Sequence, residues 1–360
     1  MEAICHISLD AITQNYTYFQ KRANPAQIIP VVKANAYGHG AMAITNHLHT
    51  TCAVKTFAVA TLEEAQELAS KIPEISILIF SRVFPTELTA LPKHAILSVG
   101  SMEDARSLSE TSSSAIRVHL NVNTGMNRLG LSYTEVLNLV KGDLSNLTIE
   151  GVYSHFSSSD TASDLVYTKQ NNDFKVLVDK LRDHGFSGMV HIANSAASLH
   201  HGQDPFDAVR LGIGLYGYDT SPAAEHQSFL KPAMTVSAPL IRVARIQAGE
   251  SVSYAEKWQS AVDTNIGTLR MGYADGYARV LSNRGIVCHH GKSYPVIGTV
   301  TMDHIMIDLG EDEPQTGEMF EVMGGENPAV QIHTISKIRN TIPYEICCAI
   351  SARVKRIYLT

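Results

Sequence analysis

The first two thirds of the chain alternate short apolar runs with longer segments whose apolar residues recur at helical spacing. Residues 62–71 and 169–183 are two of these helical segments. A helix between two strands returns the chain to the same edge of the sheet, so successive strands run parallel. The apolar runs that predict strands cover residues 28–32, 56–60, 76–80, 95–99, 116–122, 149–155, 189–193 and 208–211.

About eight strand–helix units in roughly 230 residues match the size of a (β/α)8 barrel. A doubly wound open sheet is the alternative, because hydrophobic periodicity does not show whether the outermost strands pair. We therefore predict an α/β fold in which residues 1–232 form a TIM-type barrel.

The pattern changes after Pro232. Downstream, strand-like runs are separated by Gly and Pro turns, and a single helix-like segment lies near residues 335–340. This pattern of strands and turns predicts a second, mainly β domain over residues 233–360.

Composition and charge exclude several classes of function. The 360 residues are 44% hydrophobic and carry 29 Lys+Arg against 35 Asp+Glu, for a net charge of −6. This mild acidity, without a basic block, argues against nucleic acid or an anionic membrane as a partner. No 18-residue apolar run is present, and the N-terminus, with Glu2 and no basic region, lacks the pattern of a signal peptide. We expect a cytoplasmic protein that acts on a small molecule.

The cysteines are few and scattered. They lack CxxC spacing, so we predict neither a disulfide framework nor a zinc site, and no metal. A reducing compartment fits this pattern best. The five are Cys5, Cys52, Cys288, Cys347 and Cys348.

Lys33 directly follows the apolar run 28–32, at the end of a strand where barrel enzymes place their chemistry. A desolvated lysine there has a lowered pKa and can form a Schiff base with an aldehyde. A lysine that extends its charge into solvent from a strand end is the alternative, and this segment alone does not decide between them.

The segment VVKANAYGHG (31–40) resembles the lysine motif of alanine racemases, which are pyridoxal-phosphate enzymes built from a barrel and a β domain. The resemblance implies pyridoxal 5'-phosphate as cofactor and the interconversion of L-alanine and D-alanine, which supplies D-alanine for peptidoglycan. Further stretches match the family in order along both domains: 123–130, 154–160, 191–199, 210–217, 251–258 with 271–279, and 301–310.

The resemblance implies two acid–base residues. Racemisation needs a base on one face of Cα and an acid on the other, because a single group would return the proton to its own side. Lys33 matches the lysine that holds the cofactor, and Tyr254 matches the second group, although a half-buried strand tyrosine is the plainer reading of its pattern. In the family this tyrosine reaches into the other subunit of a head-to-tail homodimer. Met302, which looks like a specificity wall, and Asp303 would enter the partner's pocket in the same way.

Arg210 matches the arginine that faces the pyridine nitrogen of the cofactor. A guanidinium stays protonated, so it leaves that nitrogen unprotonated, and the weaker electron sink favours racemisation over transamination. His191 and His155 match histidines beside it. A structural ion pair for Arg210 and ordinary core positions for the histidines are the alternatives.

The remaining matched residues bind the cofactor or the substrate, or pack against the catalytic tyrosine. Arg128 matches the arginine that contacts the phenolic oxygen of the cofactor and the substrate carboxylate. Tyr273 and Asp275 match residues packed against the catalytic tyrosine. The residues that match the phosphate site are Tyr37, Ser195, Gly212, Ile213 and Tyr344.

The chain departs from the family pattern near Arg128. Many members carry a carbamylated lysine seven residues earlier, where this chain has Asn121. Asparagine cannot form a carbamate, so we expect a small anion such as chloride between Asn121 and Arg128. Smaller departures are Asn123 for Asp, Asn127 for Gly, Ala255 for Gly and Ala278 for Pro.

Other functions remain open at this level. A serine racemase or a racemase of broad specificity is the nearest alternative, because pocket shape decides which side chain fits. A barrel-type amino-acid decarboxylase would place an acidic residue where this chain has Arg210. A non-enzymatic pyridoxal-phosphate carrier would lack the second domain and Tyr254.

Overall fold

The computed structural model describes residues 2–142, 144–160, 165–202, 206–222 and 224–360. Contacts divide the chain into two compact units. The unit that we call the barrel unit comprises Ala11–Ala36 and Ala41–Lys231. The other, which we call the β unit, comprises Met1–Asp10, Tyr37–Gly40 and Pro232–Thr360.

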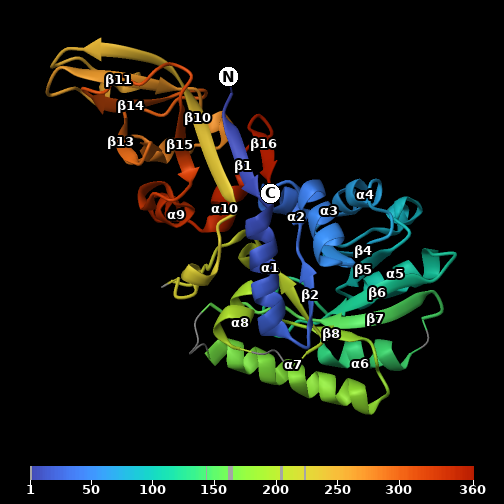
Figure 1. The fold of residues 1–360 in the computed structure, drawn as a ribbon. Helices are drawn as coiled ribbons and strands as arrows, with labels where there is room; N and C mark the ends of the chain where they lie inside the picture. The colour runs from blue at the N-terminus through green and yellow to red at the C-terminus, as the bar shows by residue number, and fades with distance from the viewer. Residues whose placement is uncertain (1, 143, 161–164, 203–205, 223) are drawn as a thin grey trace. The chain divides into compact units, whose positions relative to one another are not determined.

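The barrel unit contains a parallel sheet with, in its described part, eight strands in the order β2-β9-β8-β7-β6-β5-β4-β3 (Figure 1). Val31 forms a parallel bridge to Ala58, next to β2 and β3, so the two ends of the sheet approach each other and the barrel nearly closes. This confirms the predicted barrel over the open sheet. The strands are β2 (Gln27–Pro30), β3 (Thr56–Val59), β4 (Ser76–Ile79), β5 (Ala95–Val99), β6 (Ile116–Asn121), β7 (Leu147–Tyr153), β8 (Met189–His191) and β9 (Ala208–Leu211).

The helices between these strands bury one apolar face. In α7, Phe174, Leu177 and Leu181 are fully buried, as the spacing of three and four residues requires. Thr61 begins α4 with a capping box to Glu64. The helices that alternate with the strands are α1 (Leu9–Ala23), α3 (Ala41–Cys52), α4 (Leu62–Ala69), α5 (Met102–Thr111), α6 (Tyr133–Lys141), α7 (Leu165–Asp183) and α8 (Ser195–His200), with 3-10 turns η1 (Pro85–Ala90), η2 (Ile213–Tyr216) and η3 (Gln227–Phe229). The element α2 (Lys33–Tyr37) is instead a short turn of left-handed backbone.

The β unit is built on a sheet ordered β11-β14-β13-β12-β15-β10-β1-β16 within the described residues. β10 pairs antiparallel with β1, β11 and β15, whereas β1 pairs parallel with β16. The predicted mainly β character is therefore confirmed. The strands are β1 (Ile4–Ser8), β10 (Met234–Ile246), β11 (Thr264–Leu269), β12 (Ile286–His289), β13 (Lys292–Ile297), β14 (Ile305–Gly310), β15 (Met319–Gly324) and β16 (Lys355–Leu359).

Helical segments of the β unit are short. The predicted helix near 335–340 corresponds to α9 (Ile332–Arg339), and a second helix, α10 (Pro343–Cys348), was not predicted. Proline at its first position fits the start of a helix, but six residues are too few for a periodic pattern. The 3-10 turns are η4 (Tyr254–Glu256), η5 (Tyr273–Asp275), η6 (Arg279–Leu281) and η7 (Pro328–Val330).

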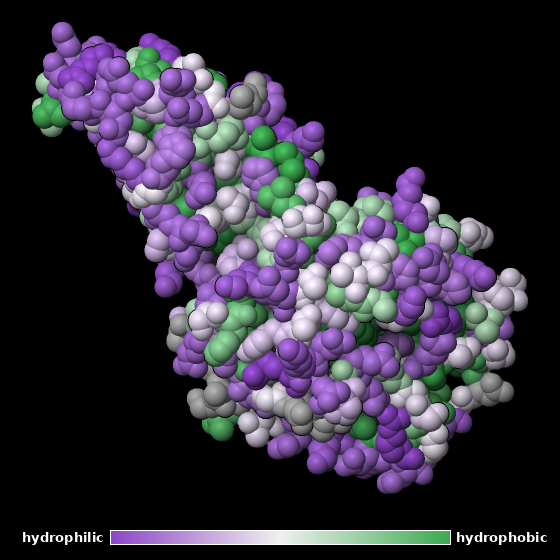
Figure 2. All heavy atoms as spheres, viewed as in Figure 1, coloured by the Kyte–Doolittle hydropathy of each residue, from purple (hydrophilic) through white to green (hydrophobic). Residues whose placement is uncertain are grey.

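Hydrophilic side chains cover most of the face drawn in Figure 2, and hydrophobic ones are scattered between them. In the part of the chain that the structure describes, every helix is too short or too polar to cross a membrane.

Candidate active site

Lys33 lies just beyond β2, where two backbone contacts hold the end of the strand. The N–H of Val32 donates to the carbonyl of Ala58 at 2.9 Å. The Tyr216 hydroxyl donates to the carbonyl of Val31 at 2.9 Å. The lysine is half-buried, at the carboxyl edge of the barrel sheet. This is the position that sequence analysis predicted.

The backbone directly after Lys33 turns in the left-handed sense. Ala34, Asn35, Ala36 and Tyr37 have φ between 51° and 53° although none is glycine. Such a conformation costs about 1–2 kcal/mol per residue, so neighbouring groups must hold it. Glu64 does so, since its Oε1 accepts from the Ala34 N–H at 2.6 Å while its Oε2 accepts from the N–H of residue 60 at 2.7 Å, at the start of α4. Glu64 could not be singled out from the sequence, because its position is that of an ordinary helix-capping residue.

Arg210 is buried on β9 and donates to groups from two other strands. Its Nη1 lies 2.7 Å from Nδ1 of His191, and its Nη2 lies 3.0 Å from Nδ1 of His155. Nη2 also donates to the carbonyl of Ser154 at 2.7 Å and to that of Ile192 at 3.1 Å. The three predicted residues Arg210, His191 and His155 are thus brought together.

The histidines around Arg210 are neutral. Burial, followed by the charge of Arg210, lowers the pKa of His155 to about 3. The same two causes hold the pKa of His191 well below its ordinary value of 6.5. Because a guanidinium can only donate, each ring must accept at Nδ1. Arg210 therefore keeps its charge and has no capacity to take up a proton.

A third histidine extends this chain of hydrogen bonds. Nδ1 of His119, on β6, lies 2.9 Å from Nε2 of His191. Since Nδ1 of His191 accepts from Arg210, its Nε2 carries the hydrogen and donates to His119. The ring of Tyr153 stacks on His191 at 5.1 Å between centroids and lies 5.2 Å from the Arg210 guanidinium carbon. His119 and Tyr153 were missed, because each sits in an apolar strand pattern that is typical of core positions.

Ser195 and the turn after β9 form a small polar cradle. The Ser195 hydroxyl oxygen accepts from the N–H of Gly212 at 3.0 Å and from that of Gly214 at 3.1 Å. A Cβ on Gly214 would lie 2.5 Å from the ring of Phe19 and 3.1 Å from the Cβ of Ser195, so glycine allows this close approach. The serine hydrogen remains for a third acceptor, as an anion site requires. Predicted Ser195, Gly212 and Ile213 lie together here.

Arg128 lies on an exposed loop that the end of β6 closes. The N–H of Leu131 donates to the carbonyl of Asn121 at 2.8 Å, and the N–H of Asn123 donates back to Leu131 at 3.0 Å. Inside the loop, the side-chain oxygen of Asn123 accepts from the N–H of Asn127 at 3.1 Å. The charge of Arg128 also lowers the pKa of His155, although burial and the charge of Arg210 lower it more.

Tyr254, in the β unit, is 71% exposed at the tip of a tight turn. Ser253 and Ala255 on either side have φ of 69° and 60°. Thr299 holds the turn, because its carbonyl accepts from the Ser253 hydroxyl at 2.6 Å and its own hydroxyl donates to the carbonyl of Tyr254 at 3.0 Å. The turn therefore leaves the Tyr254 side chain exposed to solvent.

Four further predicted residues of the β unit lie on neighbouring segments. The Ala274 N–H donates to the carbonyl of Met302 at 3.1 Å. Arg353 links the two segments, with Nε 3.2 Å from the carboxylate of Asp275 and Nη2 2.8 Å from that of Asp303. Tyr273 and Met302 are 43% and 52% exposed. Arg353 was missed, because nothing near it in the sequence marks a site.

Tyr37 and Tyr344 also meet within the β unit. Their ring centroids lie 5.7 Å apart. Nε of Arg356 donates to the carbonyl of Gly38 at 3.0 Å and fixes the segment that carries Tyr37. Gly38 has φ of 81°, and a Cβ there would lie 2.2 Å from the carbonyl oxygen of Cys347, so only glycine fits. The two tyrosines predicted to bind phosphate are thus brought together.

Comparison with known families agrees with this geometry. The family model described as alanine racemase, N-terminal domain, matches residues 7–220, and that described as alanine racemase, C-terminal domain, matches residues 233–358. The chain belongs to the alanine racemase family. Alanine racemase 1 of Clostridium acetobutylicum is 35% identical over 98% of this chain and 94% of its own length. The alanine racemase of Carboxydothermus hydrogenoformans is 35% identical over 98% of both chains.

Solved structures of alanine racemases share the whole fold. The enzyme of Streptomyces coelicolor has a TM-score of 0.92 at 28% identity and covers 100% of this chain and 98% of its own. The alanine racemase of Bartonella henselae, solved with covalently bound pyridoxal phosphate, has a TM-score of 0.87 at 31% identity and covers 100% of both chains.

Proposed function

We propose that this chain interconverts L-alanine and D-alanine with pyridoxal 5'-phosphate, and that Lys33 and Tyr254 are its two acid–base groups. The observation that carries the proposal is the buried Arg210 guanidinium, which lies between the neutral rings of His155 and His191. An arginine so held cannot protonate a pyridine nitrogen, which separates this site from one built for decarboxylation or transamination. The covalently bound cofactor of the Bartonella henselae relative supports the cofactor assignment.

The residues of the barrel unit fit this cofactor. The Ser195 hydroxyl, whose oxygen accepts from the N–H groups of Gly212 and Gly214, keeps its hydrogen for a phosphate oxygen, and we assign Gly212 and Ile213 to the same phosphate. We assign Tyr37 and Tyr344 to the same phosphate, and Lys33 to the covalent link. When bound, pyridoxal phosphate supplies an electron sink that acidifies the Cα hydrogen of an amino acid.

The two acid–base groups would work from opposite faces of Cα. The Lys33 amine removes the hydrogen from one enantiomer while the Tyr254 hydroxyl supplies one from the other side, and the roles exchange in the reverse direction. Arg128 holds the substrate carboxylate, and Met302 limits the size of the substrate side chain. A neutral Asn121 leaves Arg128 without a carbamate partner, so we place a chloride ion beside them.

We further propose a head-to-tail homodimer with shared sites. Residues 1–232 would bind the cofactor, and residues 233–360 would contribute to the partner's site. The support is the exposure of Tyr254, Met302 and Tyr273, three large side chains of the β unit that are open to solvent. We place the protein in the cytoplasm, where its five free cysteines would stay reduced and its D-alanine would enter peptidoglycan synthesis.

Deuterium incorporation tests the reaction. Cofactor-loaded protein is incubated in heavy water with L-alanine, and separately with L-serine and L-lysine. We expect D-alanine with one deuterium at Cα and little product from the other two. Comparable conversion of serine would indicate a racemase of broad specificity, and loss of CO₂ would refute the proposal in favour of a decarboxylase. Lys33→Ala is the control for cofactor chemistry free in solution.

Subunit mixing tests the shared site. Lys33→Ala and Tyr254→Phe are each expected to lose activity, but their heterodimer would contain one intact site. Random exchange then restores up to about one quarter of the parental activity. Mixing Lys33→Ala with the double variant is the matched control and should restore none. If exchange is proven by mass spectrometry and activity stays absent, the sites are not shared.

A further inference from the structure

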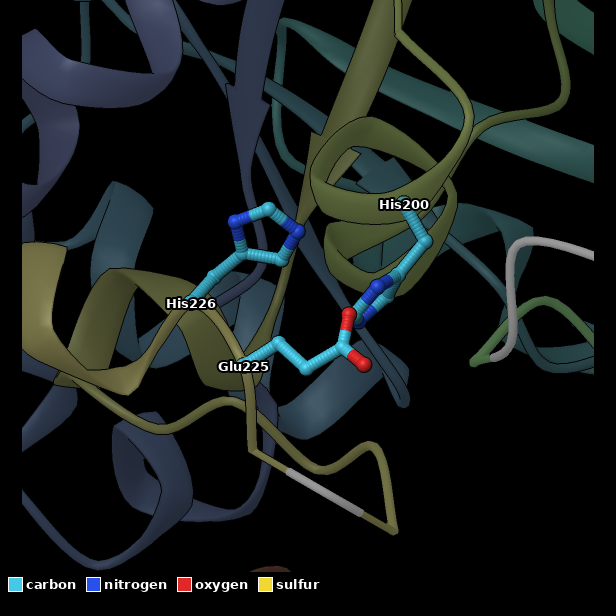
Figure 3. Close-up of side chains that lie close together, drawn as sticks. All are labelled: His200, Glu225 and His226. Carbon is cyan, nitrogen blue, oxygen red and sulfur yellow. The ribbon is translucent and has the colours of Figure 1, made fainter.

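The barrel unit holds a cluster of metal-binding side chains that the racemase reaction does not use. His200 ends α8, and Glu225 and His226 lie just before η3 (Figure 3). One ligand atom of each, a ring nitrogen or a carboxylate oxygen, lies within 4.8 Å of the others. Figure 3 shows the three side chains pointing toward one another from two different segments.

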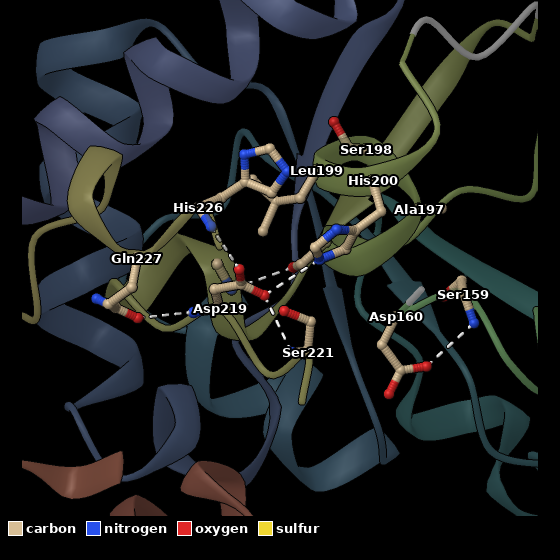
Figure 4. Close-up of polar contacts among 12 residues, drawn as sticks. Ser159, Asp160, Ala197, Ser198, Leu199, His200, Asp219, Ser221, His226 and Gln227 are labelled. Carbon is tan, nitrogen blue, oxygen red and sulfur yellow. Dashed lines mark hydrogen bonds and ion pairs between the residues drawn. The ribbon is translucent and has the colours of Figure 1, made fainter. Parts of the chain in front are cut away.

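A buried carboxylate fixes both histidines. Asp219 is fully buried, and its Oδ1 lies 3.2 Å from Nε2 of His200 while its Oδ2 accepts from the backbone N–H of His226 at 2.9 Å (Figure 4). Oδ1 also accepts from the N–H of Ser221 at 3.0 Å. Nε2 of His200 therefore faces the Asp219 carboxylate, and Nδ1 is the ring nitrogen left for a metal ion. Such a carboxylate is the usual second partner of a histidine that coordinates a metal, because it fixes the orientation of the ring.

We propose that His200, Glu225 and His226 bind a divalent transition metal ion of the zinc class, with Asp219 as the carboxylate behind the histidines. Two imidazoles and one carboxylate are ligands that zinc accepts, with room for water as the fourth. Tetrahedral ligands at bonds of about 2.1 Å lie roughly 3.4 Å apart. The exposed Glu225 side chain can rotate to close the remaining distance.

A second cluster in the β unit provides the contrast. His289, His290 and Glu318 also bring ligand atoms within 4.8 Å. However, Nε2 of His289 lies 2.8 Å from the Glu318 carboxylate, and its Nδ1 lies 3.1 Å from the carbonyl of Met319. Both ring nitrogens of His289 therefore already face oxygen atoms of the protein, which compete with a metal ion for them. We assign no metal to this cluster, and it serves as a control.

The proposed ion would join α8 to the segment that follows η2. α8 begins at Ser195, in the phosphate cradle, and ends at His200, five positions along the chain. A metal at its end therefore anchors this short helix and stabilises the barrel unit. Cysteine spacing gave no sign of this site, because its ligands are two histidines and a carboxylate from separate segments.

Metal titration of the intact holoenzyme tests the proposal. Protein treated with a chelator and transferred to phosphate-free buffer is titrated with Zn²⁺ by calorimetry, and with Co²⁺ by visible absorption. We expect one equivalent per chain, no thiolate-to-cobalt band, and a higher melting temperature with zinc. Glu225→Gln and His226→Ala should weaken zinc binding by at least about 100-fold, and Asp219→Asn by about 10–100-fold. His290→Ala is the matched control and should bind like the parent.

Several results would overturn the proposal. These are the absence of a stoichiometric site, equal binding by parent and His226→Ala, or loss of binding in His290→Ala instead. A thiolate band would assign the metal to a cysteine such as the exposed Cys348. Glu225→Gln replaces only an exposed carboxylate, so circular dichroism should show a folded chain and its binding result stays decisive.

Discussion

Lowering the pH should destabilise this protein through the histidines that neighbour Arg210. Nη1 of Arg210 lies 2.7 Å from Nδ1 of His191, and Nε2 of His191 lies 2.9 Å from Nδ1 of His119. A proton on either Nδ1 would remove an acceptor and place a second positive charge near the guanidinium. The folded protein therefore resists protonation at these rings, whereas the unfolded chain does not.

The size of the effect follows from the pKa values. Burial, partly opposed by Glu150, lowers the pKa of His119 from 6.5 to about 4. Between these values the unfolded state binds more protons, so stability decreases as the pH falls from 6.5 toward 4. At about pH 5 the penalty for one such histidine is about 2 kcal/mol, at 1.36 kcal/mol per pH unit. His155, with a pKa of about 3, contributes a similar amount in the same direction.

The assay compares urea unfolding at about pH 7 and about pH 5 for the parent and for His119→Gln. Other groups also titrate in this range, so the difference between the two proteins isolates His119. We expect the loss of stability on acidification to be smaller in His119→Gln by about 2 kcal/mol. His184→Gln, at an exposed histidine, is the control at equal protein concentration. Equal losses in parent and His119→Gln would refute the reasoning, as would a histidine NMR spectrum showing His119 charged at about pH 5.

Three further predictions concern the site. Gly214→Ala should cost about 1–3 kcal/mol of unfolding free energy, because its Cβ would overlap an aromatic ring, and denaturant unfolding measures this. Ser195→Ala should raise the dissociation constant of the cofactor about tenfold, measured by fluorescence of the dialysed protein, since one charge-assisted hydrogen bond is lost. Arg353→Gln should leave the free energy of unfolding almost unchanged, since the ion pairs to Asp275 and Asp303 are partly exposed. It should nevertheless raise the KM for alanine, and an unchanged KM would exclude Arg353 from positioning the loop at Asp303.

The barrel strands could be predicted because each is a local apolar run beside a helix. β1 could not be predicted, because its five residues give little pattern of their own. Its neighbours β10 and β16 also lie more than 200 residues away along the chain. The contacts place residues 1–10 with the β unit for the same reason. Pairing across such a separation depends on the whole fold, which periodicity does not report.

The candidate site divides in the same way. Residues inside recognisable motifs, such as Lys33, Arg210 and Ser195, could be named from the sequence. The residues that hold the backbone and the hydrogen bonds around them could not be named from the sequence. Glu64 holds the left-handed turn after Lys33, and His119 accepts the hydrogen bond from the His191 ring that contacts Arg210, yet each has an ordinary place in its own helix or strand.

The departures from the family pattern have a backbone explanation. Asn127 and Ala255, which stand where the pattern has glycine, have φ of 56° and 60°. Asparagine enters this left-handed region readily, whereas alanine is strained there by about 1–2 kcal/mol. Ala278, in place of proline, has φ of −60°, the value that proline would impose. The fold thus keeps the conformation that glycine or proline would favour, and the hydrogen bonds of Thr299 hold Tyr254 in a turn that its own sequence disfavours.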